Sequence, residues 1–168
     1  RTFNRITVDG DTSTNDMALI LANGKAGNKS IRAGSSAYKK FVEKLTELCL
    51  CLAHKIVLDG EGATKFVTIQ VQGTKAKTHA NKVAQSVATS SLVKTALFGQ
   101  DPNWGRIIAA VGYAGVPFNP DRVKISLNDS VLFNNGVPTK GSLQSTLRKK
   151  MKSKNISIII DLKSGNHS

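Results

Sequence analysis

Carboxylate side chains are scarce in this basic chain, and five of them fall in two short stretches that contain glycine. The 168 residues include 24 Lys and Arg but only 11 Asp and Glu. The five are Asp9, Asp11 and Asp16 in the first stretch and Asp59 and Glu61 in the second. Glycines at positions 60 and 62 flank Glu61 where a helical pattern gives way to a strand pattern. This arrangement presents a carboxylate on a tight junction.

Glu61 has two interpretations from its spacing. A carboxylate placed on a junction suits binding of a substrate ammonium group or a metal ion, or general acid–base chemistry. Alternatively, Asp59 caps the end of the preceding helix and Glu61 is a solvated turn residue. The spacing alone does not choose between them.

Asp9 and Asp11 offer a second candidate site. An Asp that follows a strand, with another Asp two residues later and then a hydroxyl residue, is typical of a Mg-dependent phosphohydrolase with Asp9 as nucleophile. Such an enzyme also needs a separate acidic metal site, and the carboxylates after Glu61 are far apart in sequence. In the other interpretation the turn is a structural corner that binds no metal, and residues 12–14 cap a following helix.

The stretch 100–112 contains the third candidate. Asp before Pro before an apolar run predicts a helix start with Asp101 as the cap and Pro102 in the first turn. Asn103 and Arg106 are donors that can bind a substrate carboxylate, with Trp104 lining a pocket. Trp104 as a core aromatic residue is the equally weighted alternative.

Apolar periodicity predicts that strands and helices alternate along the chain. Strands are expected at residues 3–8, 67–71, 123–127, 131–133 and 156–162, with a hairpin turn at 128–130. Helices are expected at 17–22, 38–56, 77–88, 102–112 and 141–152, while 92–99 is ambiguous. In the helix at 38–56 apolar residues recur every three or four positions, which predicts a core-facing stripe. The fold class is α/β or α+β, one layered domain over 1–168 with helices on a mixed β-sheet.

Composition narrows the function classes. No apolar run approaches the roughly 20 residues of a membrane span, and Cys49 and Cys51 lie too close together in a helical pattern to form a disulfide framework. The formal charge of +13 suggests a non-enzymatic nucleic-acid binder, but the positive residues are spread along the chain and aromatic residues make up 5%. Most of this charge is therefore expected to be solvated surface, and no nucleic acid or membrane is expected as a partner. The start at Arg1 instead of Met suggests part of a larger or processed protein.

Three segments together resemble a known family: Thr2 to Asp16 (TFNRITVDGDTSTND), Asp59 to Lys65 (DGEGATK) and Leu92 to Arg106 (LVKTALFGQDPNWGR). They are similar to the β-chain of the ornithine acetyltransferases, also called glutamate N-acetyltransferases, of arginine biosynthesis. The resemblance covers nearly the whole chain, in order.

The resemblance implies a precursor that cuts itself before a threonine into α and β chains, which assemble as α2β2. The freed threonine would lie upstream of Arg1 and carry acetyl from N-acetylornithine to glutamate in a ping-pong cycle without a cofactor. It also implies acetyl-CoA as a further donor in some members, and a location in the cytoplasm or, in a eukaryote, an organelle matrix. This segment alone, which lacks the threonine, the oxyanion hole of the α-chain and the C-terminal end of the β-chain, is expected to be inactive.

Among the residues of this chain, the resemblance places Glu61 near the amine of the amino-acid substrate. Supporting roles are expected for Asp9, Asp11, Lys65, Asn103 and Arg106.

Overall fold

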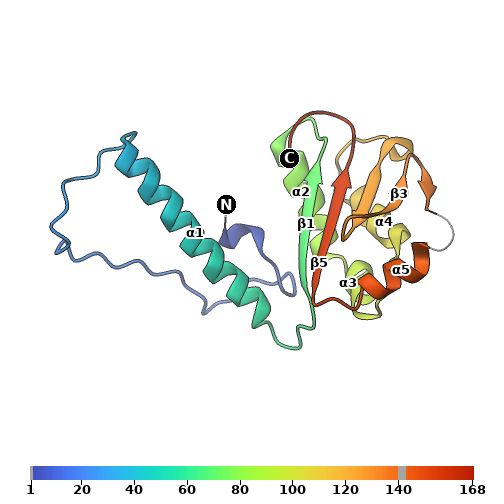
Figure 1. Cartoon of the computed structure of the whole chain (residues 1–168), viewed down its shortest axis with the longest axis horizontal. Helices are drawn as coiled ribbons and strands as arrows, with labels where there is room; N and C mark the ends of the chain where they lie inside the picture. Colours follow the sequence, from blue (N-terminus) through green and yellow to red (C-terminus); the bar gives the residue numbers. More distant parts are fainter. Residues whose placement is uncertain (1, 140–142) are drawn as a thin grey trace. The chain divides into compact units, whose positions relative to one another are not determined.

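The computed structural model describes residues 2–139 and 143–168, which form two compact units, Arg1–Gly60 and Glu61–Ser168 (Figure 1). Each unit is described below by itself. None of the described helices is both long and apolar enough to cross a lipid bilayer.

The first unit consists of a short 3-10 helix η1 (Phe3–Arg5), a long connection, and helix α1 (Ser36–Leu58). The predicted strand at 3–8 is wrong, because η1 and irregular backbone occupy these positions and no strand of the described chain pairs with them. The predicted helix at 17–22 is also wrong: the segment is irregular and Met17 and Leu21 are more than 80% exposed. A six-residue helix is not stable without a surface to bury its apolar side chains.

Helix α1 confirms the predicted helix at 38–56 and extends it at both ends. The Ser35 hydroxyl caps its start by accepting a hydrogen bond from the Tyr38 N–H at 3.1 Å. The predicted core-facing stripe is wrong for the described chain, since Phe41 is 49% and Leu48 57% exposed. Ala53 is the one residue of α1 that is buried among the described residues.

The second unit is built on a five-stranded mixed sheet in the order β1-β5-β2-β3-β4. The strands are β1 (Phe66–Gln72), β2 (Lys124–Leu127), β3 (Ser130–Asn134), β4 (Val137–Pro138) and β5 (Asn155–Asp161). β1 and β5 are parallel, and the remaining pairs are antiparallel. The predicted hairpin is confirmed: β2 and β3 are joined by Asn128 and Asp129, both with positive φ, as the favoured two-residue hairpin turn requires.

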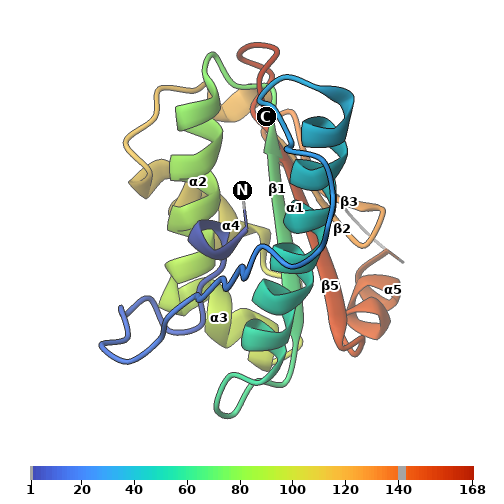
Figure 2. The same ribbon diagram turned by 90° about the vertical axis from the view of Figure 1, so that its left-hand side faces the viewer.

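Four helices complete the second unit: α2 (Lys77–Thr89), α3 (Ser91–Phe98), α4 (Trp104–Tyr113) and α5 (Leu143–Lys150). A 3-10 turn, η2 (Pro120–Arg122), precedes β2. Helices α2, α3 and α4 lie on one side of the sheet (Figure 2). The helix predicted at 77–88 is confirmed by α2, and the ambiguous stretch 92–99 is helix α3. The helix predicted at 141–152 is confirmed by α5 for its described part, because residues 141 and 142 lie outside the described ones.

The core lies between the sheet and these helices. Alternate residues of β5, Ile156, Ile158 and Ile160, are at most 2% exposed and meet Val83 of α2 and Val111 of α4 in one apolar cluster. The intervening residues of β1 and β5 are mostly polar and more exposed. The predicted fold class, helices packed on a mixed sheet, is therefore confirmed as α+β. The single predicted domain over 1–168 corresponds to two compact units.

Candidate functional site

Glu61 lies in the turn that opens the second unit, between two glycines with different structural roles. Gly62 has φ +68°, a conformation that a residue with a Cβ rarely adopts. A Cβ on Gly60 would approach the Val8 side chain to 2.9 Å and the Val57 carbonyl to 3.2 Å. Both positions therefore favour glycine.

The Glu61 carboxylate is exposed, and within the described ranges 2–139 and 143–168 it makes no hydrogen bond and no ion pair. Asp59 occupies the position that ends α1, where its N–H donates to the Lys55 carbonyl at 2.9 Å. Asp59 thus fits the structural role foreseen for it, while Glu61 has an acceptor group that the fold does not use.

Lys65, just before β1, is held by the fold. Its Nζ donates to the carbonyl oxygens of Met151 at 2.6 Å and Ser153 at 3.1 Å. These carbonyls follow α5, where the helix dipole is negative and attracts a cation. Lys65 therefore ties the start of β1 to the end of α5.

Asn103 is the N-cap of α4, so the prediction that Asp101 caps this helix with Pro102 in its first turn is wrong. The Asn103 Oδ1 accepts from the Arg106 N–H at 3.1 Å. Asp101 supports the cap indirectly: its Oδ2 accepts a hydrogen bond from the Asn103 Nδ2 at 3.0 Å, which orients the capping amide. The cap belongs to the residue nearest the first turn, since only its side chain reaches the free N–H groups.

Arg106 and Trp104 also have structural contacts. The Arg106 Nη1 donates to the Leu92 carbonyl at 3.1 Å and to the Thr95 Oγ1 at 2.8 Å, which joins α4 to α3. The Trp104 ring stacks on Phe133 with centroids 4.9 Å apart and packs against the core. Of the two interpretations of Trp104, the core aromatic one describes the structure.

Asp9 and Asp11 lie in the first unit in an exposed local turn, where the Asp9 Oδ1 accepts from the Asp11 N–H at 2.8 Å. Residues 12–14 cap no helix, so that part of the prediction is wrong; the Ser13 hydroxyl instead accepts from the N–H groups of Asn15 and Asp16. Across the residues that the structure describes, no three His, Cys, Asp or Glu side chains are grouped so as to hold a metal ion. The geometry gives no support to the phosphohydrolase alternative.

The four candidates of the second unit come from two separate stretches of the chain. Glu61 and Lys65 share the connection before β1, and Asn103 and Arg106 share the first turn of α4. Asp9 and Asp11 belong to the other unit. Among the six candidates, Glu61 and Asp11 each have an exposed carboxylate with no partner in the part of the chain that the structure describes, and Glu61 is the one of the two that lies in the second unit.

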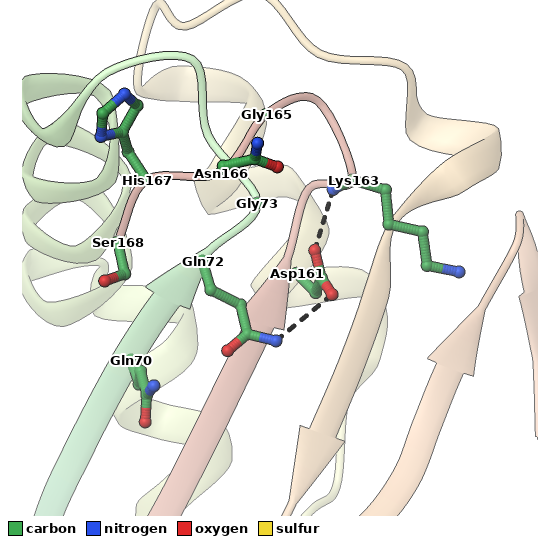
Figure 3. Close-up of a pocket in the computed structure, with 9 residues that line it drawn as sticks. All are labelled: Gln70, Gln72, Gly73, Asp161, Lys163, Gly165, Asn166, His167 and Ser168. Carbon is green, nitrogen blue, oxygen red and sulfur yellow. Dashed lines mark hydrogen bonds between the residues drawn. The ribbon is translucent and has the colours of Figure 1, made fainter.

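Sequence reasoning missed a pocket of about 560 Å³ at the carboxyl ends of β1 and β5 (Figure 3). Asp161 lies at its centre, where its Oδ2 accepts from the Gln72 Nε2 at 3.2 Å and its Oδ1 from the Lys163 N–H at 2.9 Å. The adjacent carboxyl ends of parallel strands are the signal that could have indicated it. The pocket lies at the carboxyl end of β1, whereas Glu61 belongs to the connection before its amino end.

Comparisons with known proteins agree with the sequence resemblance. The chain is similar to the crystal structure of the arginine biosynthesis bifunctional protein argJ from Bacillus halodurans, with a TM-score of 0.92 and 40% identity over 99% of this chain and 78% of that chain. It is 54% identical to the arginine biosynthesis bifunctional protein ArgJ of Desulfotalea psychrophila, over 98% of this chain and 42% of that protein. It is 47% identical to the glutamate N-acetyltransferase of Methanocaldococcus jannaschii, again over 98% and 42%.

The fold and these relatives together define a class, the α+β chains of arginine-biosynthesis proteins and glutamate N-acetyltransferases. A family model described as the ArgJ family matches residues 1–168. This chain belongs to the ArgJ family, and the resemblance to the ornithine and glutamate N-acetyltransferases is confirmed. The chain spans about two fifths of the length of the curated relatives it matches.

Proposed function

We propose that this chain is part of an acetyltransferase of arginine biosynthesis that moves an acetyl group from N-acetylornithine to glutamate. Membership of the ArgJ family supports the proposal, as does a relative named glutamate N-acetyltransferase at 47% identity. The chain carries part of the substrate site and not the nucleophile. By the same proposal the enzyme is located in the cytoplasm or, in a eukaryote, in an organelle matrix.

The proposed reaction proceeds in two acyl transfers. The hydroxyl of a threonine upstream of Arg1, freed by self-cleavage of a precursor, attacks the acetyl carbonyl of N-acetylornithine, and its own amine acts as base. The amide C–N bond breaks, the ornithine nitrogen takes the proton, and an acetyl ester of the threonine remains. The amine of glutamate then attacks this ester, which yields N-acetylglutamate and restores the threonine hydroxyl.

Glu61 is the residue of this chain that we assign to substrate binding. The observation that supports it most is its exposed carboxylate, which has no partner in the described fold and lies between two positions that favour glycine. A carboxylate of this kind can accept charge-assisted hydrogen bonds from a substrate ammonium group. Lys65, Asn103 and Arg106 support the site indirectly, by holding the elements of the second unit in place.

Steady-state kinetics of the complete enzyme tests this role. The substitution Glu61→Gln keeps the size of the side chain and removes its charge. A charge-assisted hydrogen bond is worth about 1.5–3 kcal/mol, so kcat/KM for acetyl transfer should fall about ten- to a hundredfold with little change in thermal stability. Glu43→Gln is the matched control, since Glu43 is an exposed carboxylate on α1. A value for Glu61→Gln within twofold of the control would make Glu61 a solvated turn residue.

A partner chain forms part of the same proposal. We propose that the remainder of the precursor forms an α-chain, which supplies the oxyanion hole and assembles with this chain as α2β2. The exposed apolar stripe of α1, which includes Phe41, Leu48 and Leu52, supports an interface there because large apolar patches on isolated chains mark association sites. Mass measurement of the intact assembly and of its separated chains tests this stoichiometry.

A second donor, acetyl-CoA, is proposed for the same site because several relatives are named bifunctional. Formation of N-acetylglutamate from acetyl-CoA and glutamate, measured beside the N-acetylornithine reaction, tests it.

The nucleic-acid alternative makes a different prediction about salt. A protein that binds nucleic acid through basic residues loses affinity steeply as the salt concentration rises, whereas the selectivity of an enzyme for its amino-acid substrate should persist.

A further inference from the structure

Positive side chains gather at the end of α5 and in the turn that leads from it to β5. Residues 130–160 include six Lys and Arg and no Asp or Glu. Four of the six are exposed, namely Arg148, Lys149, Lys152 and Lys154, and we call these four the α5 basic patch. In the part of the chain that the structure describes, none of the four side chains has a hydrogen bond or an ion pair.

The fold uses the lysines next to this patch but not the patch itself. The Lys150 Nζ donates to the Asn128 carbonyl at 2.8 Å, and the Lys65 Nζ donates to the carbonyls that follow α5. The dipole of α5 favours positive residues in its last turn, but Lys152 and Lys154 lie beyond the helix. Crowded like charges repel one another, which costs stability. The patch therefore carries charge that the described fold does not need and that a bound anion would neutralise.

The α5 basic patch lies beside the connection that carries Glu61. The Phe66 N–H, at the start of β1, donates to the Lys154 carbonyl at 2.7 Å, and the Lys65 Nζ reaches the Met151 carbonyl at 2.6 Å. Glu61 precedes Lys65 by four residues, so their Cα atoms are at most about 14 Å apart, the length of four extended residues. The patch and the candidate substrate carboxylate are therefore neighbours within the second unit.

Among the substrates proposed above, acetyl-CoA is the one whose chemistry fits the patch. It carries several phosphate groups at its nucleotide end, and a long flexible arm joins them to the acetyl thioester. N-acetylornithine and glutamate carry no phosphate. Arginine and lysine bind phosphate oxygens through charge-assisted hydrogen bonds, and such bonds also fix the position of the bound group. A donor of this length can be held at the patch while its acetyl group lies at the neighbouring substrate site.

We propose that the α5 basic patch binds the phosphate groups of acetyl-CoA and so presents its acetyl group to the site to which Glu61 belongs. This inference rests on the proposed function, because it locates the binding of the second donor. In the transfer itself the threonine hydroxyl attacks the thioester carbonyl, the C–S bond breaks, and the CoA thiol takes the proton. The patch contributes to binding of the donor and takes no part in that step.

Steady-state kinetics of the complete enzyme with acetyl-CoA as donor tests the proposal. The patch variant combines Lys152→Gln with Lys154→Gln, which removes two charges beyond the end of α5. The matched control combines Lys75→Gln with Lys77→Gln, which removes two exposed charges after the other end of β1. At low salt the patch variant should raise the KM for acetyl-CoA about three- to tenfold. The kcat should not change, because the phosphates are remote from the reacting carbonyl, and the control should leave both constants unchanged.

Two further donors separate phosphate binding from other effects of the substitutions. Acetyl-pantetheine has the same thioester and arm without the nucleotide phosphates, so its KM should agree within about twofold between the parent and the patch variant. The KM for N-acetylornithine should agree in the same way. For acetyl-CoA, the difference between the parent and the patch variant should shrink as the salt concentration rises, because salt screens exposed charges.

The proposal is overturned if the patch variant and the control have the same KM for acetyl-CoA, or if the variant impairs acetyl-pantetheine as much as acetyl-CoA. It is also overturned if the variant changes the mass of the assembly, which would make the patch an interface with the partner chain. If the parent does not use acetyl-CoA, calorimetric titration with CoA decides: binding that the patch variant weakens supports the patch, and binding that is absent or unchanged overturns it. Activity with N-acetylornithine is measured separately, so failure of the patch leaves the proposed transfer between amino acids intact.

Discussion

The tie made by Lys65 should contribute measurably to the stability of the second unit, and Lys65→Met is the substitution that isolates it. Methionine keeps most of the apolar stem and removes the ammonium group that donates to the Met151 and Ser153 carbonyls. Those carbonyls would then lack their charged donor at the end of α5. Lys152→Met is the matched control, because Lys152 is exposed nearby and carries the same charge.

The expected magnitude follows from the two hydrogen bonds. The bond to Met151 is partly buried, and a hydrogen bond to a charged group of this kind is worth about 1.5–3 kcal/mol. The bond to Ser153 is exposed and adds no more than about 1 kcal/mol. Freeing the lysine side chain from one geometry returns up to about 2 kcal/mol of side-chain entropy. The net loss should be about 1–2 kcal/mol.

Denaturant unfolding followed by the fluorescence of Trp104 measures this loss. Trp104 is the single tryptophan of the chain and lies in the second unit against Phe133, so its signal reports on that unit. A loss of 1–2 kcal/mol corresponds to a fall in the unfolding temperature of about 5–10 °C for a unit of this size. If Lys65→Met and Lys152→Met unfolded within about 0.3 kcal/mol of each other, Lys65 would not be the tie described above.

Three further substitutions test other contacts of the fold. Asn103→Ala removes the cap of α4 and should cost about 1–2 kcal/mol, whereas Asn103→Ser keeps a capping oxygen and should cost less than half of that in the same unfolding assay. Gly73→Ala places a Cβ at φ +70° against the Asp161 carboxylate and should destabilise the second unit by more than about 2 kcal/mol, while Gly112→Ala in α4 meets nothing within 4 Å and should stabilise it by about 0.5–1 kcal/mol. Asp9→Asn should leave calorimetric titration with Mg²⁺ unchanged from the parent, and stoichiometric binding that this substitution abolishes would restore the phosphohydrolase hypothesis.

The sequence predicted the second unit well, because there the apolar pattern of each element agrees with the way the neighbouring elements pack on it. The alternation in residues 156–162 corresponds to a strand whose alternate residues are buried, and the residues 128–130 mark a turn that needs positive φ at two positions. Both signals are local and strong. The cap of α4 was missed by two residues, because Asp101 and Asn103 are both good capping residues and only the geometry shows which one reaches the first turn.

The candidate site could be predicted only in part. Glu61 was singled out from its flanking glycines, and its role in binding a substrate stays a prediction. Lys65, Asn103 and Arg106 attracted attention because they are polar and lie in the motifs that carry the resemblance. In the structure their polar atoms bond to Met151, Asp101 and Leu92 of the second unit and not to Glu61. Residues in a family motif can therefore hold helices together as well as bind a substrate.

The first unit contains an amphipathic helix, α1, whose apolar stripe is exposed. The stripe on α1 has the spacing of a buried face, yet Phe41, Leu48 and Leu52 are between 44% and 57% exposed. Apolar residues at that spacing are costly to leave in water, at roughly 25 cal/mol for each Å². The pattern therefore indicates burial in the assembled protein, and it does not say which chain provides the cover. The helix itself is confirmed by α1, and we assign the cover to the proposed partner chain because this chain spans about two fifths of its relatives' length.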